Sequence, residues 1–303
     1  MDFTLYWFMF PVAVVVATTA MLSGIGGAAL FTPIFLLVFP ALGPEYPLPS
    51  ATAAFGAALL TQTFGFASGL VGYWRKRLID LGCALPFIAV AVPFAVAGAL
   101  ASHLADEVAL KATYGVLMAA GAWVMLRRGR DAGSPDAAAG LDGDAEVVPA
   151  AGATMRTVID RAGRSYSFAA PRQSAGGVVT SLGAFFTGLV STGIGEVIMP
   201  QLVKRNRVPV AVAAATSVAV VISTTAAASA TQVWSLMSAG GLNAVPWNLV
   251  CYTVPGVLIG GQLGPFLQGR LSQGAMVRAI GVLFCVIAIA MMWIAARDWR
   301  LSP

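Results

Sequence analysis

Charged residues are scarce in this chain. They make up 10% of its 303 residues, whereas soluble domains carry about 25%. Hydrophobic residues make up 58%, more than the core of a soluble protein could absorb. We therefore expect an integral membrane protein. The net charge of +5 does not indicate nucleic acid as a partner, because the basic residues lie in short loops between apolar runs, where they set membrane topology.

The groups that catalysis and metal binding need are also few. The single histidine, His103, lies at the end of an apolar run and is interpreted as interfacial. The three cysteines lie singly in apolar runs, without metal-type spacing, and are predicted to be buried structural thiols: Cys83, Cys251 and Cys285. The chain has no GxxxxGK[ST] nucleotide loop and no Ser/His/Asp set. We expect no enzyme, no catalytic residues, no cofactor and no metal.

Eight apolar segments alternate with polar connections. They span residues 5–41, 50–73, 79–102, 108–126, 176–203, 209–233, 246–268 and 275–296. The long polar gap, 127–175, separates them into four and four. Its first part, "RDAGSPDAAAGLDGDAE" (130–146), has the composition of a disordered segment. Its second part, "RTVIDRAGRSYSF" (156–168), alternates around a glycine turn and predicts a small β-hairpin.

The two halves of the chain resemble each other. Four stretches of the first half match four of the second in the same order: 22–33 with 191–200, 46–58 with 207–219, 92–102 with 254–264, and 114–125 with 280–291. The offset is about 160 to 169 residues throughout, which indicates an internal duplication. We divide the chain into a first membrane repeat (1–126), a loop (127–175) and a second membrane repeat (176–303).

The first apolar run of each half is too long for one membrane span. At about 1.5 Å per residue, residues 5–41 would form a helix of ~55 Å and residues 176–203 one of ~42 Å, whereas the hydrocarbon core is about 30 Å thick. A glycine motif interrupts each run. We predict an all-α integral membrane protein with two inverted repeats, each a glycine-broken re-entrant helical hairpin plus three transmembrane helices. Inverted repeats with broken helices are typical of secondary transporters.

Lysine and arginine provide a test of this topology. With re-entrant runs and the N-terminus outside, 15 of these residues lie on the cytoplasmic side, including those of loop 127–175, and 3 lie outside. Eight plain spans with the N-terminus inside give 12 against 6. The positive-inside rule favours the re-entrant topology, and eight plain spans remain the alternative.

The glycine motifs predict a binding site. Unwound backbone at membrane depth is tolerated where it is buried in protein or lines a cavity, and the amide groups of a restarting helix suit an anion. The breaks contain Gly24, Gly26 and Gly27 in the first half and Gly193 and Gly195 in the second, with the neighbouring hydroxyl donors Ser23, Ser191 and Thr192. The alternative is that these glycines only allow close helix packing.

Further polar residues extend this candidate site. Glu196 is the acidic residue that lies well inside an apolar run, and intramembrane carboxylates are functional candidates. We interpret it either as a proton-coupling group or as a cap of the restarting helix. Thr52 lies in the apolar segment that follows the first break, and Thr216 and Ser217 lie in its equivalent after the second. Their hydroxyls are candidate anion ligands, the alternative being hydrogen bonds between helices.

The ordered motifs resemble the TauE/SafE sulfite exporter family. They are "GIGGAALFTP" (24–33), "LPSATAA" (48–54), "GIGEVIMP" (193–200), "VPVAVAAATS" (208–217) and "VPGVLIGGQLG" (254–264). The resemblance implies a transporter, and specifically an exporter, of sulfite, organosulfonates or related sulfur-containing anions in the bacterial inner membrane. Glu196 stands where the family pattern has a glycine. The expected partners are a small anionic solute and the lipid bilayer. The alternatives are a membrane scaffold or assembly protein, and an uncoupled permease for another small anion.

Overall fold

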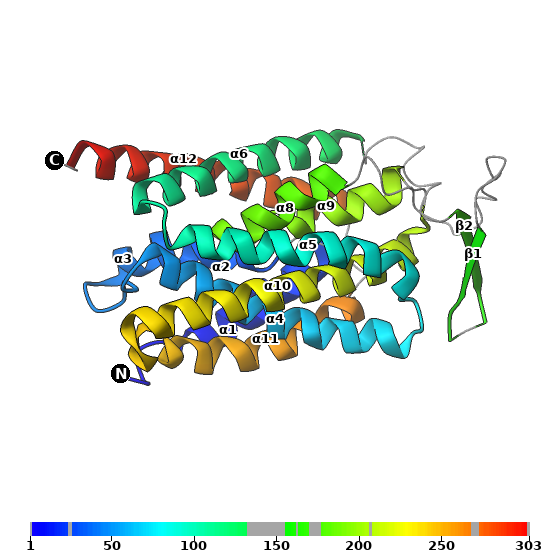
Figure 1. The fold of residues 1–303 in the computed structure, drawn as a ribbon, viewed down its shortest axis with the longest axis horizontal. Helices are drawn as coiled ribbons and strands as arrows, with labels where there is room; N and C mark the ends of the chain where they lie inside the picture. Colours follow the sequence, from blue (N-terminus) through cyan, green and yellow to red (C-terminus); the bar gives the residue numbers. More distant parts are fainter. Residues whose placement is uncertain are drawn as a thin grey trace.

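The structure is a computed structural model that describes residues 2–23, 26–131, 155–161, 163–169, 177–205, 208–267 and 273–301. Most of these residues are helical (Figure 1). The segment predicted to be disordered, 130–146, lies outside the described residues from position 132 onward.

In the first half, the described residues form six α-helices and one π-helical turn. They are α1 (Met9–Ser23), α2 (Ala28–Pro33), the π-helix Ile34–Val38, α3 (Phe39–Leu42), α4 (Ala51–Arg75), α5 (Leu81–Ser102) and α6 (Glu107–Asp131). Ser50 caps α4 by accepting a hydrogen bond from Ala53 N, and Asp80 caps α5 by accepting one from Gly82 N. Both are residue types that favour helix starts.

The second half is also helical. It contains α8 (Gly177–Val190), α9 (Ile194–Pro200), the π-helix Gln201–Arg205, α10 (Val210–Gly240), a 3₁₀ turn (Leu242–Ala244), α11 (Trp247–Leu267) and α12 (Gln273–Leu301). Five helical stretches in the described residues are long and apolar enough to cross a membrane, and shorter apolar helices accompany them. The five are Ala51–Arg75, Leu81–Ser102, Glu107–Arg127, Ala211–Gly240 and Arg278–Arg300.

Both glycine motifs interrupt a helix. The first break follows α1, and its residues Gly26 and Gly27 lead into α2. The second joins α8 to α9 through Ser191, with φ of 62°, and Gly193, with φ of 138°. Positive φ ends the α-helical conformation, and glycine adopts it without steric cost. The long apolar runs are therefore divided into short helices at the motifs.

Close helix pairs hold the bundle together. Helix α6 packs along α12, α1 along α11, and α5 along α8, while α4 and α10 lie between them (Figure 1). At the α5–α8 crossing, a Cβ on Gly98 would lie 2.0 Å from Phe185 O, and one on Gly188 would lie 2.0 Å from Ala95 O. Since no side chain fits there, glycine allows the two backbones to touch.

Cys251 corrects one sequence-based expectation. Cys83 is buried and Cys285 is partly buried, but Cys251 is exposed on α11, so the prediction of three buried thiols is wrong for this residue. Membrane helices present apolar residues to lipid as well as to the core. An apolar sequence context therefore does not separate the two faces.

A two-stranded antiparallel hairpin lies in the 127–175 segment, in the stretch whose alternation predicts one. Strand β1 (Met155–Ile159) pairs with β2 (Ser165–Ala169), and Thr157 stands opposite Ser167. The hairpin lies at one end of the bundle, while both ends of the described chain lie at the other (Figure 1).

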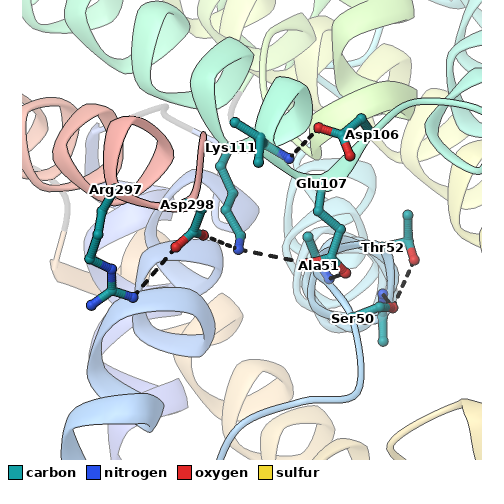
Figure 2. Close-up of polar contacts among 10 residues, drawn as sticks. Ser50, Ala51, Thr52, Asp106, Glu107, Lys111, Arg297 and Asp298 are labelled. Atoms are coloured by element: carbon teal, nitrogen blue, oxygen red, sulfur yellow. Dashed lines mark hydrogen bonds and ion pairs between the residues drawn. The ribbon is translucent and has the colours of Figure 1, made fainter. Parts of the chain in front are cut away.

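A network of polar side chains (Figure 2) lies where α6 begins and α12 ends, at the end of the bundle opposite the hairpin (Figure 1). Lys111 Nζ lies 2.8 Å from Asp298 Oδ2 and 3.7 Å from Glu107 Oε2. Glu107 Oε1 accepts a hydrogen bond of 3.2 Å from Ala51 N, at the start of α4. The network thus joins α4, α6 and α12.

Candidate functional site

The two helix breaks meet in space. A Cβ atom built on Gly26, in the first break, would lie 3.5 Å from Glu196 Oε1, beside the second. The same point lies 3.5 Å from both Oε1 and Nε2 of Gln62, which comes from α4. Because Gly26 has no side chain, the carboxylate and the amide both approach its backbone. The site combines α4, the first break and α9.

Hydrogen bonds from side chains satisfy the amide groups at the start of α9. Glu196 Oε2 accepts a bond of 3.1 Å from Gly193 N, three residues earlier. Thr187 Oγ1 accepts a bond of 2.7 Å from Ile194 N and donates one of 2.9 Å to Gly183 O. The Glu196 contact has the geometry of a helix cap, in which an acidic side chain in the first turn reaches back to the preceding amide.

Side chains also form hydrogen bonds with backbone groups at the start of α2. Ala28 N donates a hydrogen bond to Gln62 Oε1. The hydroxyl of Tyr114, on α6, donates a bond of 2.8 Å to Ala29 O. Gln62 is 4% exposed and Tyr114 is fully buried. Two polar side chains from neighbouring helices therefore hold the half-helix that follows the first break.

A hydroxyl pair joins the two breaks directly. Thr32 Oγ1, on α2, lies 2.7 Å from Ser191 Oγ in the second break, and both residues are buried. Ser191 holds its positive φ although it is not glycine, a strained conformation that persists where the surroundings fix it. The bond supplies one such constraint.

The Oε1 atom of Glu196 has no hydrogen-bond partner among the residues that the structure describes. This atom is buried, whereas the residue as a whole is partly exposed. No ion pair to Glu196 occurs in the described part of the chain, and the side chains of Lys204 and Arg205 lie outside it. The described residues also hold no cluster of three potential metal ligands. Backbone amides therefore provide the polar surroundings of the carboxylate.

The remaining residues of the predicted site fall in different places. Thr192 and Gly195 are buried at the second break, and a Cβ on Gly27 would lie 3.7 Å from Ala20 Cβ. Ser23 ends α1, but its side chain and the whole of Gly24 lie outside the described residues.

The three hydroxyl residues of the later spans make contacts away from the breaks. Thr52 shares a hydrogen bond of 2.8 Å with Ser50 beside the polar network of Figure 2. Thr216 Oγ1 accepts a bond of 3.2 Å from Asp80 N, before α5. Ser217 Oγ donates one of 2.9 Å to Ala214 O in its own helix.

The sequence predicts Gln62, further along the same apolar segment as Thr52, as a residue that lines the path and not as one of the anion ligands. Its signal in the sequence is an amide residue in the middle of an apolar helix, where an unpaired polar group would be costly. Thr32 gave a weaker signal, because a threonine in an apolar helix commonly bonds its own backbone.

Comparison with known proteins identifies the family of this chain. The chain is 22% identical over 279 residues to "Probable membrane transporter protein YunE" of Bacillus subtilis (strain 168), covering 92% of this chain and 94% of that protein. No solved structure matches the chain. The family model described as "Sulfite exporter TauE/SafE" matches residues 9–291. The chain therefore belongs to the TauE/SafE sulfite exporter family and is a multi-pass membrane transporter of a small solute, not an enzyme.

Proposed function

We propose that this protein is a secondary transporter that exports sulfite, organosulfonates or related small sulfur-containing anions across the bacterial inner membrane. The anion binds between the two helix breaks. The observation that carries this proposal is the approach of Glu196 Oε1 to within 3.5 Å of the Cβ position of Gly26. Two breaks from different halves that share a buried polar centre resemble the midplane sites of secondary transporters.

The proposed architecture is a pair of inverted repeats, residues 1–126 and 176–303, with eight apolar segments. Reciprocal helix contacts support it. The α1–α11 pair corresponds to α8–α5, α4–α11 corresponds to α10–α5, and α2–α4 corresponds to α9–α10. The α4–α10 and α6–α12 pairs each join equivalent helices. A two-fold relation between the halves generates all of these pairs.

The proposed orientation places the N-terminus outside and loop 127–175 in the cytoplasm. The distribution of lysine and arginine supports it. So does the position of the hairpin at the end of the bundle opposite both ends of the described chain (Figure 1).

The proposed anion ligands are backbone amides and hydroxyls of the breaks. The amides of Gly193 and Ala28 are donors, and each is now bonded to an oxygen of a protein side chain. An anion oxygen can replace the carboxylate of Glu196 at Gly193 N. The other proposed binding residues are Ser23, Gly24, Gly26, Gly27, Ser191, Thr192 and Gly195 at the breaks, with Thr52, Thr216 and Ser217 along the path toward either end.

Replacement of the Glu196 carboxylate by an anion couples binding of the anion to protonation of Glu196. A charged Glu196 competes with the substrate for the same amide and repels it. Protonation of Glu196 weakens its bond to Gly193 N, since charge-assisted hydrogen bonds are about twice as strong as neutral ones. The site then holds one proton and one monovalent anion, or neither. The direction of net flux follows the combined gradients of anion and proton.

Flux in proteoliposomes tests the function. Labelled sulfite, sulfoacetate, thiosulfate, sulfate and methanesulfonate are loaded in parallel, with and without a pH gradient. Methanesulfonate keeps its charge over the whole range, so a pH effect on its flux reports the protein. We expect saturable flux that increases with acidity on the loading side, and loss of this pH dependence in Glu196→Gln. Glu45→Gln, which changes an exposed carboxylate, is the matched control.

The outcomes separate the candidates. Saturable flux of methanesulfonate that does not change with pH would point to an uncoupled permease, and a pH dependence retained in Glu196→Gln would exclude Glu196 as the proton carrier. The absence of flux for all five anions, from protein shown to be folded, would refute the sulfur-anion proposal and favour another solute or a scaffold role.

A further inference from the structure

The β1–β2 hairpin is docked on the membrane bundle through an apolar contact. Phe168, on β2, is fully buried and belongs to the same hydrophobic cluster as Leu78, which precedes α5, and Cys83 in its first turn. Val158 and Tyr166 of the hairpin pack against the same cluster. Since an isolated two-stranded hairpin is marginal in water, this docking accounts for its stability.

An ion pair fixes the hairpin beside the start of α5. Arg156 Nη1 donates a hydrogen bond of 2.9 Å to Asp80 Oδ1, which also accepts one of 2.9 Å from Gly82 N. A Cβ on Gly82 would lie 1.8 Å from Arg156 Nη1. The missing side chain therefore leaves the space that the guanidinium occupies.

A backbone contact completes the attachment. Arg161 N, in the hairpin turn, donates a bond of 3.1 Å to Lys76 O at the end of α4. Asp160 stabilises the turn by accepting bonds from Arg164 N and Arg164 Nε. The hairpin is thus attached at its turn and along both strands to the α4–α5 connection.

The apolar cluster that contains Phe168 extends to the half-helix that carries Glu196. The cluster around Phe168 includes Ile194 and Ile198 of α9 and Leu202 of the π-helix after it. Asp80 N donates to Thr216 Oγ1, which ties the α4–α5 connection to α10. The hairpin is therefore joined to both halves of the bundle at one end.

We propose that the hairpin is a strap that holds this end of the transporter closed, and that the Asp80–Arg156 pair is its latch. Opening of the site toward this end requires release of the strap. The latch is one hydrogen bond, and the side chain of Arg156 is 39% exposed. Water can therefore replace Asp80 as the partner of Arg156 without leaving a buried cation. The proposal rests on the transport function of the family and not on which anion is carried.

Native Cys83 reports the opening, since it is 2% exposed and lies in the cluster under the hairpin. In a Cys251→Ala, Cys285→Ala background, the rate of N-ethylmaleimide labelling at Cys83 is measured by peptide mass spectrometry in proteoliposomes. Lys76→Cys with Arg161→Cys allows a disulfide between strap and bundle, since the backbones touch there. Thr157→Cys with Ser167→Cys is the matched control, because its disulfide stays within the hairpin.

We expect oxidation of the Lys76→Cys/Arg161→Cys pair to slow Cys83 labelling about tenfold, because labelling follows the population of the open form. Reductant restores the rate, and oxidation of the control pair leaves it unchanged. Arg156→Gln raises the rate several-fold, with Arg156→Lys between the two. Equal labelling rates in the oxidised and reduced strap variant would overturn the proposal, as would an unchanged rate in folded Arg156→Gln.

Flux of sulfite and methanesulfonate is measured in the same vesicles. The oxidised strap variant should lose flux and regain it with reductant. If the protein without the added cysteines carries neither anion, the sulfur-anion proposal fails, while the labelling of Cys83 still decides whether the strap exists.

Discussion

The hydroxyls of Thr32 and Ser191 share a hydrogen bond of 2.7 Å across 159 residues of sequence and so join the two helix breaks. We expect Thr32→Val and Ser191→Ala to be coupled in a double-mutant cycle. Hydrogen bonds between membrane helices contribute about 0.6 kcal/mol on average and up to about 1.7 kcal/mol. Because both residues are buried, we expect the upper part of this range. Unfolding in mixed detergent micelles measures it, and purely additive effects would show that the bond contributes nothing.

Gln62 should matter for transport as well as for stability. Gln62→Met removes the acceptor of Ala28 N and leaves that amide unpaired, at a cost of about 1–3 kcal/mol. Gln262→Met is the matched control, since Gln262 on α11 also forms hydrogen bonds between helices, but it donates them to Ser68 of α4 and not to the backbone of a break. We expect both variants to lose stability and only Gln62→Met to lose flux. Equal flux in the two variants would place Gln62 outside the site.

The α5–α8 crossing should not tolerate any side chain at its glycines. Gly98→Ala places a methyl group 2.0 Å from Phe185 O, so the helices must separate, and overpacking costs about 1–3 kcal/mol or more. Gly72→Ala is the control, because nothing lies within 4 Å of its Cβ position. There alanine should be neutral, or stabilise the helix by up to about 1 kcal/mol. Thermal unfolding in detergent distinguishes the two, and equal midpoints would contradict the close packing.

The Lys111–Asp298 pair should depend on salt. The side chains are 18% and 23% exposed, so water and ions screen their interaction, and we expect a coupling of about 1 kcal/mol or less. A double-mutant cycle with Lys111→Met and Asp298→Asn should give a smaller coupling at about 1 M salt than at about 0.01 M, because the Debye length falls from about 30 Å to about 3 Å. A coupling that does not change with salt would indicate a pair shielded from solvent.

The positions of the helix breaks were predictable from the sequence, whereas the neighbours of each break were not. Two glycine motifs in runs too long for one span required the chain to leave the helix near Gly26 and Gly193. The fold as a helical membrane protein of the TauE/SafE family also followed from composition and motif order. Repeat symmetry and re-entry stay predictions, supported by the reciprocal helix contacts.

The side chains that meet at the breaks depend on helix rotation, which the sequence does not specify. The sequence predicts Thr52 and Thr216 as anion ligands because they follow the breaks along the chain. However, each lies in the first two turns of a long helix, and the structure places them near opposite ends of the bundle. Gln62 lies about three turns further along α4, at the depth of the breaks, and its contact with Ala28 required the packing of α2 on α4.

The bond from Gly193 N to Glu196 has a consequence for the transport cycle. A carrier whose binding amides were left bare without substrate would reorient only when loaded, and it would act as an obligatory exchanger. Here the protein's own carboxylate fills the position of the absent anion, so the empty carrier can return without exposing an unpaired amide to the low-dielectric interior. Under the proposed mechanism the protein performs net transport. Efflux of labelled methanesulfonate into anion-free buffer should match efflux into buffer containing unlabelled methanesulfonate, whereas in Glu196→Ala the first should become much slower than the second.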